Sequence, residues 1–181
     1  MSKLLANDTY QDEYSEDFVS NWDDLIGWEG REEGEARFFH RLLKTYDVNT
    51  VLDAACGTGF HSITLARDGF EVTAADGSEN MIKQTQENAD AKGVKLAGTR
   101  AIDWANLTEE FPENRFDALI CLGNAFTHLF EHEVRRDCLR SMYDVLKPGG
   151  MIIVDHRNYD DILENGYSSK HQYYYVGENV D

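Results

Sequence analysis

Long hydrophobic runs, cysteine and basic side chains are all scarce in this sequence, and each shortage excludes a class of protein. No run among the 181 residues approaches the roughly 18 apolar residues of a membrane-spanning helix, so a transmembrane protein is not expected. The N-terminal stretch MSKLLANDTYQDEYSEDF is acidic and lacks the basic and apolar regions of a secretory signal peptide. The sequence therefore predicts a cytoplasmic location.

Only three cysteines are present, Cys56, Cys121 and Cys138, and an odd number does not make a complete disulfide framework. Two of them lie inside apolar stretches, which predicts reduced thiols that are mostly buried. The six histidines are scattered along the chain without a paired ligand spacing such as H-E-x-x-H. We therefore expect no metal site.

Basic residues number 17 against 34 acidic ones, which gives a formal net charge of −17. A surface this negative repels nucleic acid and anionic membranes, so neither is an expected partner. Two interpretations of the acidic excess remain open. It can be an ordinary soluble surface, or an adaptation to a salty cytoplasm, where about 1 M salt screens charges over roughly 3 Å and removes the self-repulsion.

Segments with helical and with strand-like patterns alternate from residue 35 onward. Helices are expected at 35–46, 61–69, 78–93 and 132–146, and buried strands at 48–55, 71–76, 94–100, 116–122 and 151–157, with the turn KPGG at 147–150. This order predicts right-handed crossovers and an α/β fold, in which helices cover both faces of a mostly parallel sheet. Residues 1–34 do not follow the alternation. We expect them to form an N-terminal arm or lid, and residues 35–181 to form the main domain.

The segment VLDAACGTGF at 51–60 places two glycines directly after a strand, at the edge where parallel sheets bind ligands. A dinucleotide fingerprint needs a third glycine in G-x-G-x-x-G, and that position holds Ser62. Asp53 also directs a carboxylate toward a site that would hold phosphates. Asp76, at the end of the next strand, offers acceptors for a ribose diol. The residues therefore favour a nucleoside without phosphate over NAD.

The segment DAACGTG resembles the first motif of class I S-adenosylmethionine-dependent methyltransferases. More narrowly, the family of glycine/sarcosine N-methyltransferases of betaine synthesis is similar in VLDAACGTGFHSI, ICLGNAFTHL, VDHRNYDDIL and the upstream NWDDLIGWEGR. The resemblance implies a Rossmann-like class I methyltransferase fold with S-adenosyl-L-methionine as cofactor. It also implies N-methylation of glycine or sarcosine toward dimethylglycine, on the way to the osmoprotectant betaine in salt-adapted, halophilic microbes.

The resemblance assigns cofactor-binding roles to Ala55, Gly57, Asp76, Asp103 and Trp104. Ala55 and Gly57 would bring backbone atoms against the methionine part of the cofactor, because small residues permit close approach. Asp76 would hold the ribose hydroxyls. Asp103 would bind the adenine amino group and Trp104 would stack on the ring, although a single tryptophan is more often a core residue.

The resemblance extends the same pocket to Leu122 and to the arm. Tyr14, Trp22 and Arg31 match positions that close over the cofactor, with Arg31 pairing the methionine carboxylate. Arg31 lies inside the charged run EGREEGE, so a solvated salt bridge is an equal alternative. His128 would bridge the cofactor and the arm, or else cap or pack locally.

The substrate side rests on Asn124 and Arg157. An amino-acid substrate needs a cation for its carboxylate, and an arginine fork supplies two parallel hydrogen bonds. Arg157 follows an apolar strand at its carboxyl end, and Asn124 would contact either the substrate carboxylate or the cofactor. The sulfonium is already a good electrophile, so catalysis needs mainly in-line placement of a neutral amine about 3 Å from the methyl carbon. No residue stands out as a general base.

In the resembling family the sheet continues beyond its fifth strand with two more strands and with tyrosines that contact the substrate. This sequence stops at ENVD, just after HQYYYVG. One alternative is therefore a domain that lacks the C-terminal strands and binds S-adenosylmethionine without turnover. Another is a nicotinamide-dependent oxidoreductase, which Ser62 and Asp53 disfavour. Pocket volume decides how many methyl groups are added, and these motifs do not indicate it.

Overall fold

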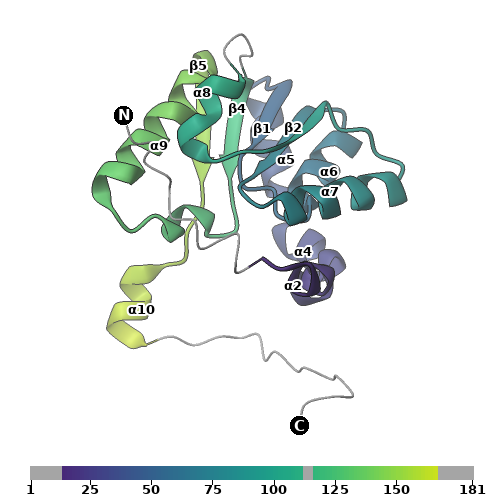
Figure 1. The fold of residues 1–181 in the computed structure, drawn as a ribbon, viewed down its shortest axis with the longest axis horizontal. Helices are drawn as coiled ribbons and strands as arrows, with labels where there is room; N and C mark the ends of the chain where they lie inside the picture. Colours follow the sequence, from purple (N-terminus) through teal and green to yellow (C-terminus); the bar gives the residue numbers. More distant parts are fainter. Residues whose placement is uncertain (1–13, 112–115, 167–181) are drawn as a thin grey trace.

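Among the residues that the structure describes, the central sheet has five strands, all parallel, in the order β3-β2-β1-β4-β5. The computed structural model describes residues 14–111 and 116–166. Helices flank the sheet on both sides (Figure 1), which confirms the predicted α/β class. The strands are β1 (Thr50–Asp53), β2 (Glu71–Asp76), β3 (Gly98–Ala101), β4 (Phe116–Cys121) and β5 (Leu146–Val154).

The helices predicted at 61–69, 78–93 and 132–146 are present with boundaries close to those expected. Ser78 begins the second of them, because its hydroxyl accepts a hydrogen bond from the Met81 N–H at 3.3 Å. The helices after residue 36 are α5 (Phe38–Thr45), α6 (Phe60–Arg67), α7 (Glu79–Ala91), η1 (Trp104–Asn106), α8 (Leu107–Glu110), η2 (Ala125–His128), α9 (His132–Asp144) and α10 (Tyr159–Asn165).

Neighbouring residues of the central strands enter two separate hydrophobic cores, because successive side chains of a strand point to opposite faces. Val51 of β1 lies in one core, together with Leu43 of α5 and Leu65 of α6. The next residue, Leu52, lies in the other core, together with Met142 of α9. The two cores fix the register of the sheet and hold its carboxyl edge in place.

Three local predictions are wrong. The segment KPGG at 147–150 is not a turn before the last strand but part of β5. Phe116 pairs with Leu146 and Ala118 pairs with Met151, so the extra residues of β5 form a bulge opposite β4. The helix predicted at 35–46 is divided, since Ala36 and Arg37 have left-handed backbone angles that end one helix before α5 begins. The strand predicted at 94–100 is shorter and begins only at Gly98.

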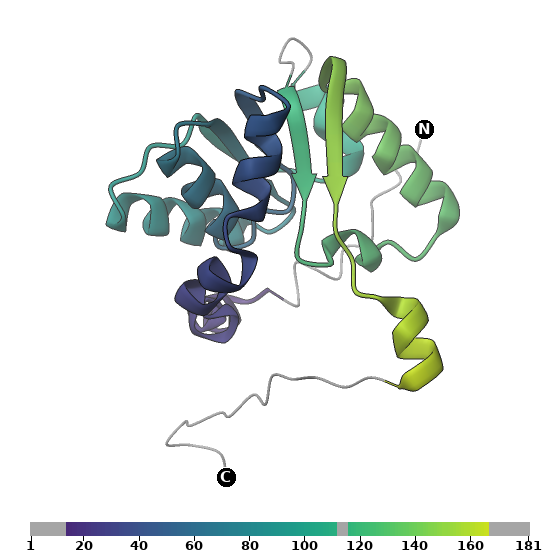
Figure 2. The same ribbon diagram turned by 180° about the vertical axis from the view of Figure 1, so that it is seen from behind.

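Between residues 14 and 36 the chain forms three short helices, α2 (Glu16–Ser20), α3 (Trp22–Ile26) and α4 (Trp28–Glu35). These arm helices lie at the end of the molecule toward which β4 and β5 point, and α10 lies at the same end on the opposite side (Figure 2). The arm and α10 therefore flank the carboxyl edge of the sheet. Among the described helices, none has the length and apolar character needed to cross a bilayer.

Candidate active site

The loop between β1 and α6 carries the two glycines and is supported by a buried carboxylate. Asp53 is only 1% exposed, and its Oδ2 accepts a hydrogen bond from the Ser62 hydroxyl at 2.7 Å. Within the described residues, its Oδ1 has no hydrogen-bond partner. Burial raises the pKa of Asp53, against the opposing influence of His61 and Ser62. Ser62, which occupies the position of a third glycine, thus donates a hydrogen bond to the carboxylate beneath the loop.

Asp76 ends β2 next to this loop, because β1 and β2 are neighbours in the sheet. Its Oδ2 accepts from the Gly57 N–H at 2.9 Å, and its Oδ1 accepts from the Ser78 N–H at 3.0 Å. Burial raises the pKa of Asp76 to about 6, although both backbone bonds favour the ionised form. A carboxylate accepts about four hydrogen bonds, so this one keeps capacity for a diol.

Trp104 and Ala55 come together at the ends of β1 and β3. The Trp104 indole N–H donates to the Ala54 carbonyl, and both Trp104 and Ala55 pack against the core beside α9. The Phe126 ring lies 6.1 Å from that of Trp104, so η2 adds an aromatic wall that the sequence analysis did not identify. Asp103 accepts from the Ala105 N–H at 2.8 Å and caps η1.

The structure does not place Leu122 with Trp104. The Leu122 side chain is buried in the core of α5 and α6, with Leu43 and Val51, whereas Trp104 packs against the other core. Adjacent residues alternate across the sheet, so a leucine at this point of the chain faces away from the aromatic wall. His128 is exposed at the end of η2.

The arm reaches the glycine loop through Trp22. A Cβ atom built on Gly57 would lie 3.7 Å from the Trp22 indole nitrogen. Tyr14 packs edge-on against Trp22 with ring centroids 6.2 Å apart, and the Tyr14 carbonyl accepts from the Asn80 side chain at 2.9 Å. Tyr14, Trp22 and Gly57, which the sequence analysis grouped around the cofactor, are therefore close together.

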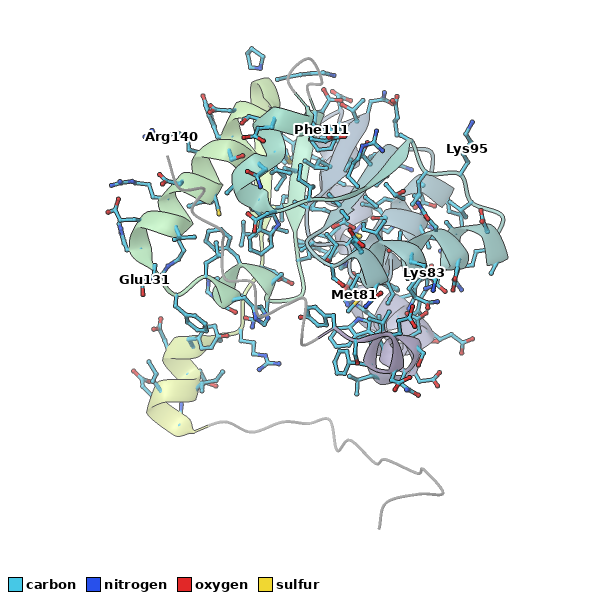
Figure 3. All side chains as sticks on the ribbon, in the orientation of Figure 1. Met81, Lys83, Lys95, Phe111, Glu131 and Arg140 are labelled. Atoms are coloured by element: carbon cyan, nitrogen blue, oxygen red, sulfur yellow. The ribbon has the colours of Figure 1, made fainter. Side chains whose placement is uncertain are left out.

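Asp23, which the sequence analysis missed, fastens the arm to the loop. Its Oδ1 accepts from the Thr58 hydroxyl and from the Trp28 indole N–H, and its Oδ2 accepts from the Asn88 side chain at 2.7 Å. Asn88 also donates to the Thr58 carbonyl at 2.9 Å. One carboxylate thus joins α3 to both the glycine loop and α7. Figure 3 shows Lys83 on the part of α7 beside the arm, where its ammonium lies 3.3 Å from the Glu16 carboxylate.

Arg31 forms a salt bridge, but its partner belongs to a network that reaches α6. The Arg31 Nε donates to Glu35 Oε1 at 2.8 Å, and the guanidinium carbon lies 4.9 Å from the centroid of the Phe60 ring. His61 Nε2 lies 3.1 Å and 3.0 Å from the two Glu35 oxygens. Burial opposes ionisation of Glu35, yet His61 and Arg31 outweigh it and lower the Glu35 pKa.

On the other half of the edge, Asn124 and Arg157 meet beyond β4 and β5. The Asn124 N–H donates to Asp155 Oδ1 at 2.8 Å, and Asn124 Oδ1 accepts from the Arg157 N–H at 3.1 Å and from the Tyr159 hydroxyl at 3.0 Å. The Arg157 residue is exposed. Tyr159 is a further polar group of this cluster. It lies in the VDHRNYDDIL block, but no sequence spacing identifies it as a site residue.

The two halves of the edge have different chemistry. The half at β1, β2 and β3 offers Asp76 as an acceptor, a close backbone approach at Gly57 and the aromatic ring of Trp104, which suits a nucleoside. The half at β4 and β5 offers the amide of Asn124 and the cation of Arg157, which suits a small anion. In residues 14–111 and 116–166, no group of three or more His, Cys, Asp or Glu side chains is arranged to hold a metal ion.

Comparisons with known proteins show which family the chain is similar to. The glycine/sarcosine N-methyltransferase of Aphanothece halophytica is 51% identical over 98% of this chain, and that of Halorhodospira halochloris is 47% identical over 99%. The chain spans 66% of the length of each. These relatives carry the family name that the motifs indicated, so the resemblance is confirmed.

Solved structures and a family model extend the comparison. A crystal structure of an S-adenosylmethionine-dependent methyltransferase from Clostridium acetobutylicum is similar with a TM-score of 0.67 over 81% of this chain and 58% of that one. Its sequence is 22% identical, so it supports the fold alone. The model of the methyltransferase domain matches residues 51–150, which include the glycine loop, Asp76 and Asn124. The chain therefore belongs to the methyltransferase domain family.

Proposed function

We propose that the protein transfers a methyl group from S-adenosyl-L-methionine to the amino nitrogen of glycine, sarcosine or both. The observation that carries the proposal is the similarity of nearly the whole chain to two glycine/sarcosine N-methyltransferases, at 51% and 47% identity. The nucleoside-like half and the anion-like half of the edge support it, because the reaction brings a nucleoside cofactor and an amino acid together.

The proposed cofactor contacts follow the strand ends. Asp76 accepts hydrogen bonds from the ribose hydroxyls, and the loop at Ala55 and Gly57 lies against the methionine part. Trp104 stacks on the adenine, and Asp103 accepts from its amino group. The free carboxylate capacity of Asp76 and the packing of Trp104 with Ala55 support these roles.

In the arm, Tyr14, Trp22 and Arg31 cover the cofactor. Their roles are supported by the contact of Trp22 with Gly57 and by the position of Arg31 over Phe60. For Leu122 we propose only a backbone contribution, since its side chain is buried on the far side of the sheet. His128 remains a proposed bridge between the cofactor and the arm. The proposed boundary between the arm and the main domain remains between residues 34 and 35.

Arg157 and Asn124 hold the substrate carboxylate in this proposal, so that the amine points at the sulfonium methyl. The nitrogen lone pair forms the new N–C bond while the methyl–sulfur bond breaks, and S-adenosylhomocysteine leaves with both electrons. The protein contributes placement and exclusion of water rather than a base, because the amine attacks in its neutral form. The proton on the product nitrogen is then lost to solvent.

A methylation assay tests the proposal. The protein is incubated with S-adenosylmethionine and glycine, sarcosine or dimethylglycine, and S-adenosylhomocysteine formation is measured. Turnover with glycine or sarcosine supports the proposal. Tight binding of S-adenosylhomocysteine without turnover would instead favour the cofactor-binding domain, and binding of NAD would favour the oxidoreductase.

We further propose that the product serves osmoprotection, as a precursor of betaine, in a salt-rich cytoplasm. The net charge of −17 supports this setting, since a strongly acidic surface is compatible with high ionic strength. The same charge supports small molecules rather than nucleic acid or anionic membranes as partners.

A further inference from the structure

Arg31 is held at one edge of its guanidinium by a chain of two residues. Its Nε donates to Glu35, whose two oxygens lie within 3.1 Å of His61 Nε2. Arg31 and Glu35 are each 26% exposed at the side chain, and His61 is 9% exposed. These side chains are therefore partly shielded from water. In such a position an ion pair of fixed geometry contributes more binding energy than it does on an open surface.

The bonding pattern leaves the other edge of the guanidinium available. In the described parts of the chain, Nε is the only side-chain nitrogen of Arg31 that donates a hydrogen bond. The Phe60 ring lies 4.9 Å from the guanidinium carbon and restricts the tilt of the plane. The two Nη groups form the planar fork that binds carboxylates through parallel hydrogen bonds.

The network lies next to the cofactor loop. Phe60 and His61 directly follow Gly59, so the first turn of α6 provides both the ring beneath the Arg31 guanidinium and the imidazole that contacts Glu35. His61 directly precedes Ser62, whose hydroxyl donates to Asp53 at the end of β1, so the network lies beside the strand end beneath the loop. An arginine that only joined α4 to α6 would not need an oriented fork whose two Nη groups have no hydrogen-bond partner among residues 14–111 and 116–166.

We propose that Glu35 and His61 are positioning residues, which orient the Arg31 fork to bind the carboxylate of the cofactor's amino-acid part. This inference rests on the proposed function, because that function names a cofactor with such a carboxylate. Glu35 fixes the rotation of the guanidinium through Nε, and His61 fixes Glu35. Neither residue contacts the cofactor itself.

The test compares two ligands that differ in the carboxylate. S-adenosylhomocysteine has the amino-acid part, whereas 5′-methylthioadenosine keeps the nucleoside and thioether but lacks it. Dissociation constants of both are measured by calorimetry for the parent protein and for Glu35→Gln. We expect Glu35→Gln to weaken the affinity for S-adenosylhomocysteine about tenfold, because a fraction of the charge-assisted hydrogen bonds is lost. The affinity for methylthioadenosine should change less than about twofold.

Glu32→Gln is the matched control. Glu32 lies on the same helix and forms an ion pair with Arg67 of α6, so it joins the arm to the same element through a different arginine. We expect both dissociation constants to stay unchanged in this variant. A further check uses Arg31→Ala as background, in which Glu35→Gln should have no additional effect on S-adenosylhomocysteine.

The outcomes separate this inference from the proposed function. If Glu35→Gln weakens both ligands equally, the pair only holds the arm in place and the positioning role is refuted. An unchanged affinity for S-adenosylhomocysteine, in a parent that binds it, refutes the role as well. A parent that binds neither ligand overturns the proposed function itself.

Discussion

Replacing Gly59 by alanine should destabilise the protein through two separable effects. Gly59 has φ +94°, a conformation that costs an alanine about 1–2 kcal/mol. The new Cβ would also lie 2.9 Å from Thr85 Cγ2 and 3.2 Å from Ile63 Cδ1. Thr85 cannot move away freely, because it is buried and its hydroxyl donates to the Gly57 carbonyl at 2.8 Å. Crowding of this kind adds about 1–3 kcal/mol, so the total is about 2–5 kcal/mol.

Gly69 is the matched control for this prediction. It has the same φ of +94°, but no neighbouring atom lies within 4 Å of a Cβ built there. Gly69→Ala should therefore show only the backbone effect. Urea unfolding followed by circular dichroism measures both variants, and the shift in midpoint at constant slope gives the change in the free energy of unfolding. Equal destabilisation of the two variants would refute the crowding argument. Adding Thr85→Ser to Gly59→Ala removes the closest methyl group and should restore part of the loss.

Three further predictions concern the site and the surface. The affinity for S-adenosylhomocysteine should fall as the pH is lowered through about 6, where Asp76 takes up a proton. Asp76→Ala should weaken binding by about 1–3 kcal/mol at neutral pH while leaving the circular dichroism spectrum intact. Calorimetry between pH 5 and 8 checks both expectations, and unchanged binding would contradict the assignment of Asp76 to the ribose. Arg157→Lys keeps the positive charge but loses the planar guanidinium fork, so turnover should fall strongly with cofactor affinity unchanged. Loss of cofactor affinity with an unchanged substrate KM would instead make Asn124 the better candidate for the substrate contact. The melting temperature should rise from low salt to molar potassium chloride if the charge of −17 is an adaptation, and a flat curve would contradict this.

The raised pKa of Asp76 has a second consequence, for stability. A carboxyl with a pKa of about 6 in the folded state and 3.8 in the unfolded state binds its proton more tightly when folded. The free energy of unfolding should therefore decrease as the pH rises from about 4 to about 6, in so far as Asp76 determines it. Asp76→Asn should remove this part of the pH dependence, which thermal melts in a pH series measure.

The strand ends were predictable because their signals are local. Apolar runs marked β1, β2 and β4, and the rule that parallel strands present ligands at their carboxyl ends placed Asp76 next to Gly57 before any geometry was known. The bulge in β5 was not predictable in this way. Lysine, proline and two glycines read locally as a turn, whereas pairing with β4 keeps the segment within the strand.

The residues that hold the arm were not predictable, because their partners are far apart in the sequence. Glu35 and His61 are 26 residues apart, and Asp23 and Asn88 are 65 apart. No periodic pattern connects such pairs until the strand order brings α4, α6 and α7 around the loop. The orientation of the Leu122 side chain was not predictable for a different reason, since the pattern indicated its place at a strand end but not the face of the sheet that its side chain would enter.

The contacts of the arm also bear on how an enzyme with the proposed function can change its substrate during evolution. Asp23, Trp28, Arg31 and Glu35 all reach residues between Thr58 and Lys92, on the half of the edge that suits the nucleoside. The cluster around Asn124 draws on β4, β5 and α10 instead. With the roles proposed above, mutations in the second group can alter which small molecule is accepted while the first group is inherited unchanged. Under the proposed function, a fold divided in this way can acquire new substrates while it keeps the contacts that bind the methyl donor.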